Sequence, residues 1–107
     1  MMDHLQVFCT TDNREEADVI SETLVREGLA ACAQITGPIT SVYRWKGSVE
    51  HAEEWLMMIK TTSEAYEALE AAIIEHHSYE TPEVVAVRIE HGSEAYLDWL
   101  RAAVRGR

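Results

Sequence analysis

The sequence predicts an α+β fold with an antiparallel sheet, and three observations lead to it. Short apolar, β-prone runs alternate with segments whose apolar residues recur at helical spacing. A Lys-Gly pair between two extended runs marks a central hairpin. The chain has 107 residues, 47% of them hydrophobic, which suits one domain with a core and is short for two. We therefore expect a single domain over residues 1–107.

The N-terminal third predicts a strand followed by a helix. Leu5 to Thr10 (LQVFCT) is short, apolar and β-prone, which is typical of a buried strand. Asp12 or Asn13 is expected to cap the helix that follows, and Gly28 is expected to end it. The apolar stripe of this helix consists of Ala17, Ile20, Leu24 and Val25.

The middle of the chain predicts a long hairpin. Ala31 to Thr36 and Ile39 to Trp45 have extended character, and Gly37-Pro38 is expected to interrupt them because proline donates no ladder hydrogen bond. Lys46-Gly47 marks the turn, and Glu53 to Thr61 is expected to return as the second arm. Exposed edges of a long hairpin invite pairing with another chain, so we expect it to serve in assembly.

The last third predicts a helix, a strand and a final helix. Thr62-Ser63 is expected to cap a helix from Ser63 to about His76, and Val84 to Ile89 is expected to form a buried strand. Ser93 is expected to cap the last helix. The order is then βαββαβ plus a C-terminal helix, which is the ferredoxin-like split β-α-β sandwich with both crossover helices on one face.

Charge and cysteine content limit the partners. Nine Lys and Arg residues stand against nineteen Asp and Glu residues, a net charge of -10, so we expect no nucleic acid partner and no anionic membrane. The apolar stretch Trp55 to Ile59 is too short to span a bilayer, and the N-terminus lacks the pattern of a signal peptide. Two widely spaced cysteines, Cys9 and Cys32, are expected to be reduced, and we expect a cytoplasmic protein.

The metal-ligand candidates each have a simpler structural interpretation. Cys32, flanked by small alanines, is either a small buried hydrophobe, which the residues alone favour, or a thiolate ligand for copper. Cys9 leaves the same two options. His76 and His77 suit either a helix C-terminus or a metal. Neighbouring helical side chains point about 100° apart, so one ion does not readily take both.

Candidate carboxylates occur without a catalytic motif around them. Glu50, Glu53 and Glu54 lie near the hairpin, and Glu80 and Glu83 flank Pro82. Paired carboxylates serve acid-base chemistry or cation binding, but most are solvated surface charges. The chain has no GxSxG, no HExxH and no phosphate-binding glycine loop. We therefore expect a protein that is not an enzyme and has no organic cofactor.

Five ordered segments carry a resemblance to a known family. They are GLAACAQI (residues 28–35), SVYRWKG (41–47), EEWLMMIKT (53–61), HSYETPEVV (77–85) and YLDWL (96–100). In this order and spacing they resemble the CutA divalent-cation tolerance proteins over nearly the whole chain. The resemblance implies a ferredoxin-like protomer in a homotrimer, similar in architecture to the PII signalling proteins, with hairpin arms paired across subunits.

The resemblance also implies a set of site residues. CutA proteins are associated with tolerance to copper and other divalent metals, and cysteine is implicated in binding. By motif match the metal candidates are Cys32, then Cys9, with His77. Some relatives have a further cysteine in the second helix, and this chain has none there. The expected inter-subunit cleft residues are Trp45, Glu54, Lys60, Tyr79 and Glu83.

The sequence leaves three hypotheses for function. The first is a trimeric, non-catalytic protein that binds copper or another divalent metal ion. The second is a PII-like regulatory or scaffold trimer that binds a small ligand or a protein in its inter-subunit clefts. The third is an enzyme, for example a hydrolase, in which Lys60, Glu54, Tyr79 and Glu83 converge in the cleft, although no catalytic motif supports it.

Overall fold

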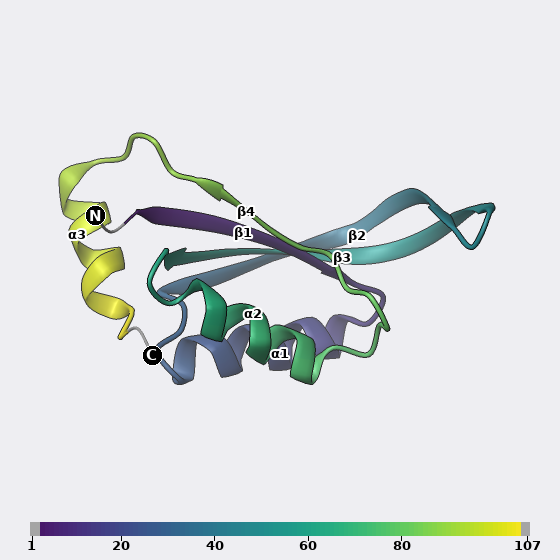
Figure 1. Cartoon of the computed structure of the whole chain (residues 1–107), viewed down its shortest axis with the longest axis horizontal. Coiled ribbons are helices and arrows are strands. Elements are labelled where there is room, and N and C mark those ends of the chain that lie inside the picture. The colour runs from purple at the N-terminus through teal and green to yellow at the C-terminus, as the bar shows by residue number, and fades with distance from the viewer. Residues whose placement is uncertain (1–2, 106–107) are drawn as a thin grey trace.

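The computed structural model describes residues 3–105 and has the predicted order of strands and helices (Figure 1). The elements are β1 (His4–Thr11), α1 (Arg14–Arg26), β2 (Cys32–Trp45), β3 (Ser48–Thr62), α2 (Tyr66–His76), β4 (Val84–Arg88) and α3 (Glu94–Ala103). The four strands form one sheet in the order β2-β3-β1-β4, and every neighbouring pair is antiparallel. The α+β split β-α-β prediction is confirmed.

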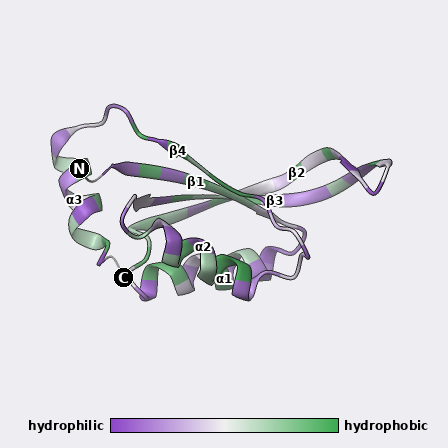
Figure 2. Cartoon of the chain, in the orientation of Figure 1, coloured by the Kyte–Doolittle hydropathy of each residue, from purple (hydrophilic) through white to green (hydrophobic). Residues whose placement is uncertain are grey.

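The core lies between one face of the sheet and two helices. α1 and α2 lie side by side beneath the sheet, while α3 lies at the end of the sheet near the start of β1 (Figure 1). Figure 2 shows green, hydrophobic segments within α1 and α2. The fully buried side chains of this core include Val7, Cys9, Ile20, Leu24, Met57, Ile59, Leu69 and Ile73.

Local capping signals placed two helix ends and the hairpin turn correctly. The Asn13 side chain accepts a hydrogen bond from the Glu16 N–H at 3.0 Å, which caps α1. The Ser93 hydroxyl accepts one from the Tyr96 N–H at 3.3 Å at the start of α3. Lys46 and Gly47 join β2 to β3 with φ of 50° and 85°, the backbone of a tight two-residue hairpin turn.

The hairpin is longer and more continuous than the sequence predicts. Pairing with β3 is interrupted at Gly37-Pro38, as predicted, by a register shift between Thr36 and Ile39, but the strand does not end there and β2 runs on to Trp45. β3 begins at Ser48 and not at Glu53. Its polar first residues lack apolar alternation, yet backbone pairing with β2 keeps them in the strand.

The predicted cap of α2 is also wrong. The helix begins at Tyr66, and its N-cap residue Ala65 makes no side-chain capping bond. The Ser63 hydroxyl instead accepts a hydrogen bond from the Asp3 N–H at 3.0 Å. The Ser63 side chain, which the sequence predicts as a cap, therefore makes a tertiary contact with the start of the chain instead.

No helix within residues 3–105 is long and apolar enough to cross a membrane.

Adjacent isoleucines of α2 give a matched test of the core. Ile73 is fully buried and Ile74 is 53% exposed. We expect Ile73→Ala to lower the free energy of unfolding by about 2–5 kcal/mol, since it removes buried methylene groups and leaves a cavity. Ile74→Ala, in the same helix, should change it by no more than about 0.5 kcal/mol. Urea unfolding followed by circular dichroism measures both, and equal effects would contradict the assigned inner face of α2.

Candidate functional site

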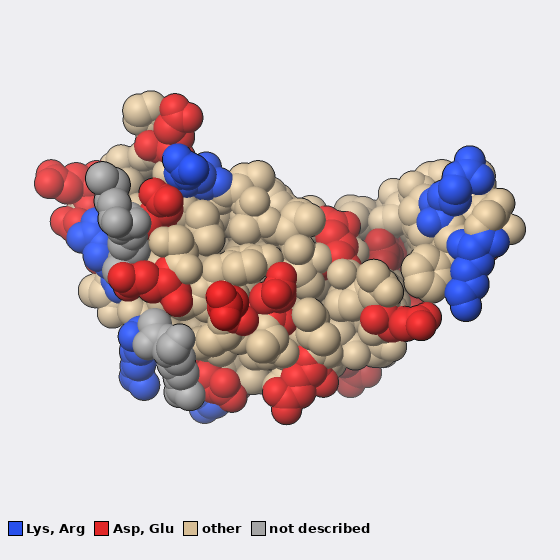
Figure 3. Space-filling model, viewed as in Figure 1, with Lys and Arg blue, Asp and Glu red and all other residues tan. Residues whose placement is uncertain are grey.

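A cleft of about 560 Å³ lies where the hairpin leaves the body of the molecule. β1, both arms of the hairpin and the loop between α2 and β4 contribute to its walls. Its aromatic and acidic lining residues are Tyr43, Trp45, Glu54, Tyr79, Glu80 and Glu83. Figure 3 shows acidic side chains gathered at the base of the hairpin and basic ones at its far end.

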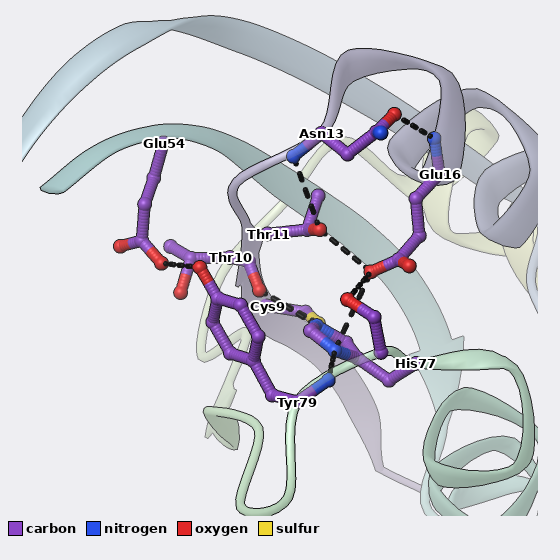
Figure 4. Close-up of polar contacts among 9 residues, drawn as sticks. Cys9, Thr10, Thr11, Asn13, Glu16, Glu54, His77 and Tyr79 are labelled. Atoms are coloured by element: carbon purple, nitrogen blue, oxygen red, sulfur yellow. Dashed lines mark hydrogen bonds and ion pairs between the residues drawn. The ribbon is translucent and has the colours of Figure 1, made fainter.

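A carboxylate and a phenol face each other in this cleft. The Tyr79 hydroxyl donates a hydrogen bond of 2.6 Å to Oε2 of Glu54 (Figure 4), and Glu54 is only 6% exposed. Burial and this hydrogen bond raise the pKa of Tyr79 well above its usual range. Tyr79 is therefore a hydrogen-bond donor at any physiological pH, and Glu54 is its acceptor.

The buried imidazole of His77 holds the loop that carries Tyr79. The Tyr79 N–H donates to Nδ1 of His77 at 3.1 Å, so Nδ1 is the acceptor nitrogen. Nε2 then carries the proton and donates it to the Thr10 carbonyl at 2.8 Å (Figure 4). Both ring nitrogens are used within the fold, and the ring positions Tyr79 against the end of β1.

Glu16 at the start of α1 completes this network. Its Oε2 accepts hydrogen bonds from the Thr11 hydroxyl at 2.6 Å and the Ser78 hydroxyl at 3.1 Å, and lies 3.5 Å from Nδ1 of His77. Burial acts to raise the pKa of Glu16, but the hydrogen bonds from Thr11 and Ser78 outweigh it, so the pKa is lowered. An ionised Glu16 thus joins α1 to the end of α2.

Cys9 lies behind this network and is fully buried. Burial, followed by the negative charges of Glu83, Glu16 and Glu54, raises the pKa of the Cys9 thiol to about 12. A thiolate is the form that binds metals and attacks reagents, so this environment suppresses both properties.

Cys32 occupies a different place, at the first residue of β2. It is partly exposed, and its Sγ lies 3.7 Å from the Tyr96 hydroxyl of α3. The hydrogen bond with Cys32 is the main cause of a raised pKa for Tyr96. In the sheet register Cys32 lies opposite Lys60, whose Nζ donates to the Gln34 side chain at 3.0 Å.

The structure therefore separates the predicted site residues into two groups. Four of the residues predicted for an inter-subunit cleft, Trp45, Glu54, Tyr79 and Glu83, line one cleft of the protomer, whereas Lys60 lies opposite Cys32 in the sheet. Their place between subunits stays a prediction. The metal candidates are divided too: His77 and Cys9 lie by the Glu16 network, and Cys32 is apart. Within residues 3–105 no three His, Cys, Asp or Glu side chains come together in a group that could hold a metal ion.

Sequence reasoning missed Glu16, Thr10 and Tyr43. Glu16 looked like an ordinary acidic residue in the first turn of a helix, and only the packing of α1 against α2 brings it to His77. Tyr43 could have been found from the hairpin register, because it pairs with Glu50 and shares its arm with Trp45. Thr10 acts through its backbone carbonyl and leaves no side-chain signal.

Comparison with known proteins places this architecture in a family. The profile of the family described as CutA1 divalent ion tolerance protein matches residues 5–103. The divalent-cation tolerance protein CutA of Thermus thermophilus is 43% identical over 95 residues, covering 89% of this chain and 92% of the relative. The chloroplastic protein CutA of Arabidopsis thaliana is 40% identical over 99 residues, which are 92% of this chain and 54% of that protein.

A solved structure agrees with these sequence matches. The divalent cation tolerance protein (Cut A1) from Thermus thermophilus superposes with a TM-score of 0.93 at 40% identity, covering 94% of this chain and 98% of that one. The match extends over sheet, helices and hairpin alike. This chain belongs to the CutA1 divalent ion tolerance protein family.

Proposed function

We propose that this chain is a non-catalytic, cytoplasmic protein that binds copper through Cys32 and acts as a homotrimer in tolerance to divalent metals. Membership of a family named for divalent ion tolerance carries the proposal. Copper is the ion to test, because it ranks highest among the common divalent ions for nitrogen and sulfur ligands.

The choice of Cys32 over the other two metal candidates rests on access. Cys9 is fully buried with a pKa raised to about 12 by burial and nearby carboxylates, and both nitrogens of His77 make internal hydrogen bonds. Cys32 is partly exposed, and its sulfur faces a tyrosine hydroxyl. Residues 3–105 of one protomer do not bring a full ligand set to Cys32, so we propose that the remaining ligands come from other copies.

Exposed apolar surface supports assembly into a trimer. Val42 and Val49 on the hairpin are each 59% exposed, and Val85 and Val87 on β4 are each 51% exposed. Val85 pairs with Phe8, so it lies on the sheet face opposite α1 and α2. Isolated apolar side chains are ordinary on surfaces, but pairs of them on the hairpin and on β4, the two edges of the sheet, favour cover by another chain.

The cleft supports a second candidate function, a PII-like regulatory or scaffold trimer that binds a small ligand or protein. The supporting observation is the lining of Trp45, Glu54, Tyr79 and Glu83 around a cavity of about 560 Å³. Sites for small molecules have volumes of this order and few, well-placed polar groups. The two functions are compatible, because Cys32 and the cleft are separate.

Copper affinity tests the role of Cys32. We expect Cys32→Ala to weaken copper binding at least about tenfold, or about 1.4 kcal/mol, because it removes the accessible soft ligand. The measurement is titration of reduced protein with Cu(I) against a competing chelator, and with Cu(II). Cys9→Ala is the matched control and should retain the affinity. Equal affinity in the wild type and Cys32→Ala would exclude Cys32 as the ligand.

Thiol reactivity separates the two cysteines independently of metal. At pH about 8 we expect a disulfide reagent to modify Cys32 in the folded protein and Cys9 only after denaturation, since burial and carboxylates raise the pKa of Cys9 to about 12. The unfolded thiol ionises near its ordinary pKa, so the Cys9 contribution to stability should be present below pH about 8.5 and decline above it. Rapid modification of Cys9 in folded Cys32→Ala would refute its assigned burial.

Assembly is tested by dilution. We expect light scattering to give the mass of a trimer at micromolar concentration, with loss of structure accompanying dissociation, because a lone protomer leaves its hairpin strands uncovered. Circular dichroism of the same diluted samples reports folding. A folded monomer at micromolar concentration would be inconsistent with the trimer.

A further inference from the structure

The geometry points to a second binding site in this molecule: we propose that the cleft at the base of the hairpin binds a guanidinium or ammonium group against the carboxylate of Glu54. The supporting observation is a nearly buried carboxylate in a cavity that also has aromatic walls. The site is separate from the copper proposal, which concerns Cys32.

The carboxylate of Glu54 has no cationic partner within residues 3–105. Its Oε2 accepts the hydrogen bond from Tyr79, a neutral donor. The ion pairs formed within residues 3–105 involve other carboxylates, and none includes Glu54. Carboxylates are rarely this buried unless a cation or several donors balance the charge. Glu54 therefore has the environment of a carboxylate whose cation comes from outside the protomer.

The electrostatic field of the cleft is negative. Glu80 and Glu83 line the same cavity as Glu54. Two of these carboxylates, Glu83 and Glu54, also add to the effect of burial in raising the pKa of the nearby Cys9 thiol. Low-dielectric walls strengthen such a field and concentrate cations in the cavity.

The aromatic lining of the cleft favours an organic cation over a bare metal ion. Tyr43, Trp45 and Tyr79 contribute rings to the walls. Faces of tryptophan and tyrosine attract guanidinium and ammonium groups. Nζ of Lys46 already lies 5.7 Å from the centre of the Trp45 ring, so this ring accepts a cation in its present position. The acidic residues of the cleft form no group suited to a metal ion within residues 3–105.

Two sources could supply the cationic group. One is a small amine or guanidine compound, for which about 560 Å³ is ample space. The other is Arg44 or Lys46 of a second copy, because these residues are the only Lys or Arg between positions 27 and 59 and place positive charge at the far end of the hairpin (Figure 3). Both sources use the same chemistry at Glu54.

Calorimetric titration with ethylguanidinium chloride tests the site. We expect binding to the wild type and a loss of about 10- to 100-fold in affinity for Glu54→Gln, which keeps the shape and the acceptor for Tyr79 but removes the charge. Ethylurea, the neutral isostere of the ligand, should not bind. Glu90→Gln is the matched control, because the Glu90 side chain is 82% exposed and lies outside the cleft, and it should bind as the wild type does.

A second arm distinguishes the two sources. If hairpin ends of neighbouring copies fill the cleft, ethylguanidinium should bind the double variant Arg44→Gln, Lys46→Gln at least about tenfold more tightly than the wild type. If the cleft is open, Arg44→Gln alone should bind as the wild type does, because any gain in the double variant then comes from freeing the Trp45 ring of the same protomer's Lys46. Both results support a cation site provided that Glu54→Gln, added in the same background, abolishes binding.

The proposal is overturned by no binding in either background, or by affinity that Glu54→Gln leaves unchanged. Thermal melts and light scattering of every variant show whether it is folded and assembled. Copper titration of Glu54→Gln should match the wild type, so failure of the cation site and failure of the copper site at Cys32 are separate outcomes.

Discussion

The buried ring of His77 is the constraint on which the cleft depends. Its two nitrogens join the carbonyl of Thr10, near the end of β1, to the loop that follows α2. Glu16 adds the start of α1 to the same junction. The neighbouring end of β1 and start of α1 thereby meet a loop that is 62 to 67 positions away in the sequence. A satisfied polar network in a dry environment is rigid, because each lost hydrogen bond leaves a buried group without a partner. This rigid network consequently holds Tyr79 at a fixed position against Glu54.

The same junction also explains why two cysteines of one small chain have different chemistry. Cys9 lies on the helix-covered face of β1, where burial and three carboxylates raise its pKa to about 12. Cys32 begins an edge strand, where α3 covers it only in part. Strand position and sheet face, more than residue type, decide which thiol a metal ion can reach.

How much could be read from the sequence depends on how local each signal is. The caps at Asn13 and Ser93 and the turn at Lys46 were predictable, because each depends on a few neighbouring residues. The continuation of β2 as one strand was not, because it depends on pairing with β3 that lapses at Gly37-Pro38 and resumes at Ile39. The candidate site follows the same rule. The motifs that resemble CutA proteins led to five residues of an inter-subunit cleft, and four of them lie together in one protomer while Lys60 does not. Such motifs do not say which residues converge on one copy, so the place of all five between subunits stays a prediction. Glu16 was missed because its role arises from helix packing, which no local pattern encodes.

One structural feature, the hairpin that extends beyond the body, links assembly to ligand binding. Its arms leave apolar side chains such as Val42 and Val49 exposed, and its base forms one wall of the cleft that holds Glu54. Any copy that packs on the hairpin therefore lies beside the cleft. A cation that stabilises one arrangement of the hairpin must favour the assembly that shares this arrangement. Because binding free energies are reciprocal, the assembly must favour cation binding by the same free energy. Cys32 lies away from this wall of the cleft. Metal binding at Cys32 is therefore not linked to cation binding at Glu54, unless assembly of the trimer couples the two sites.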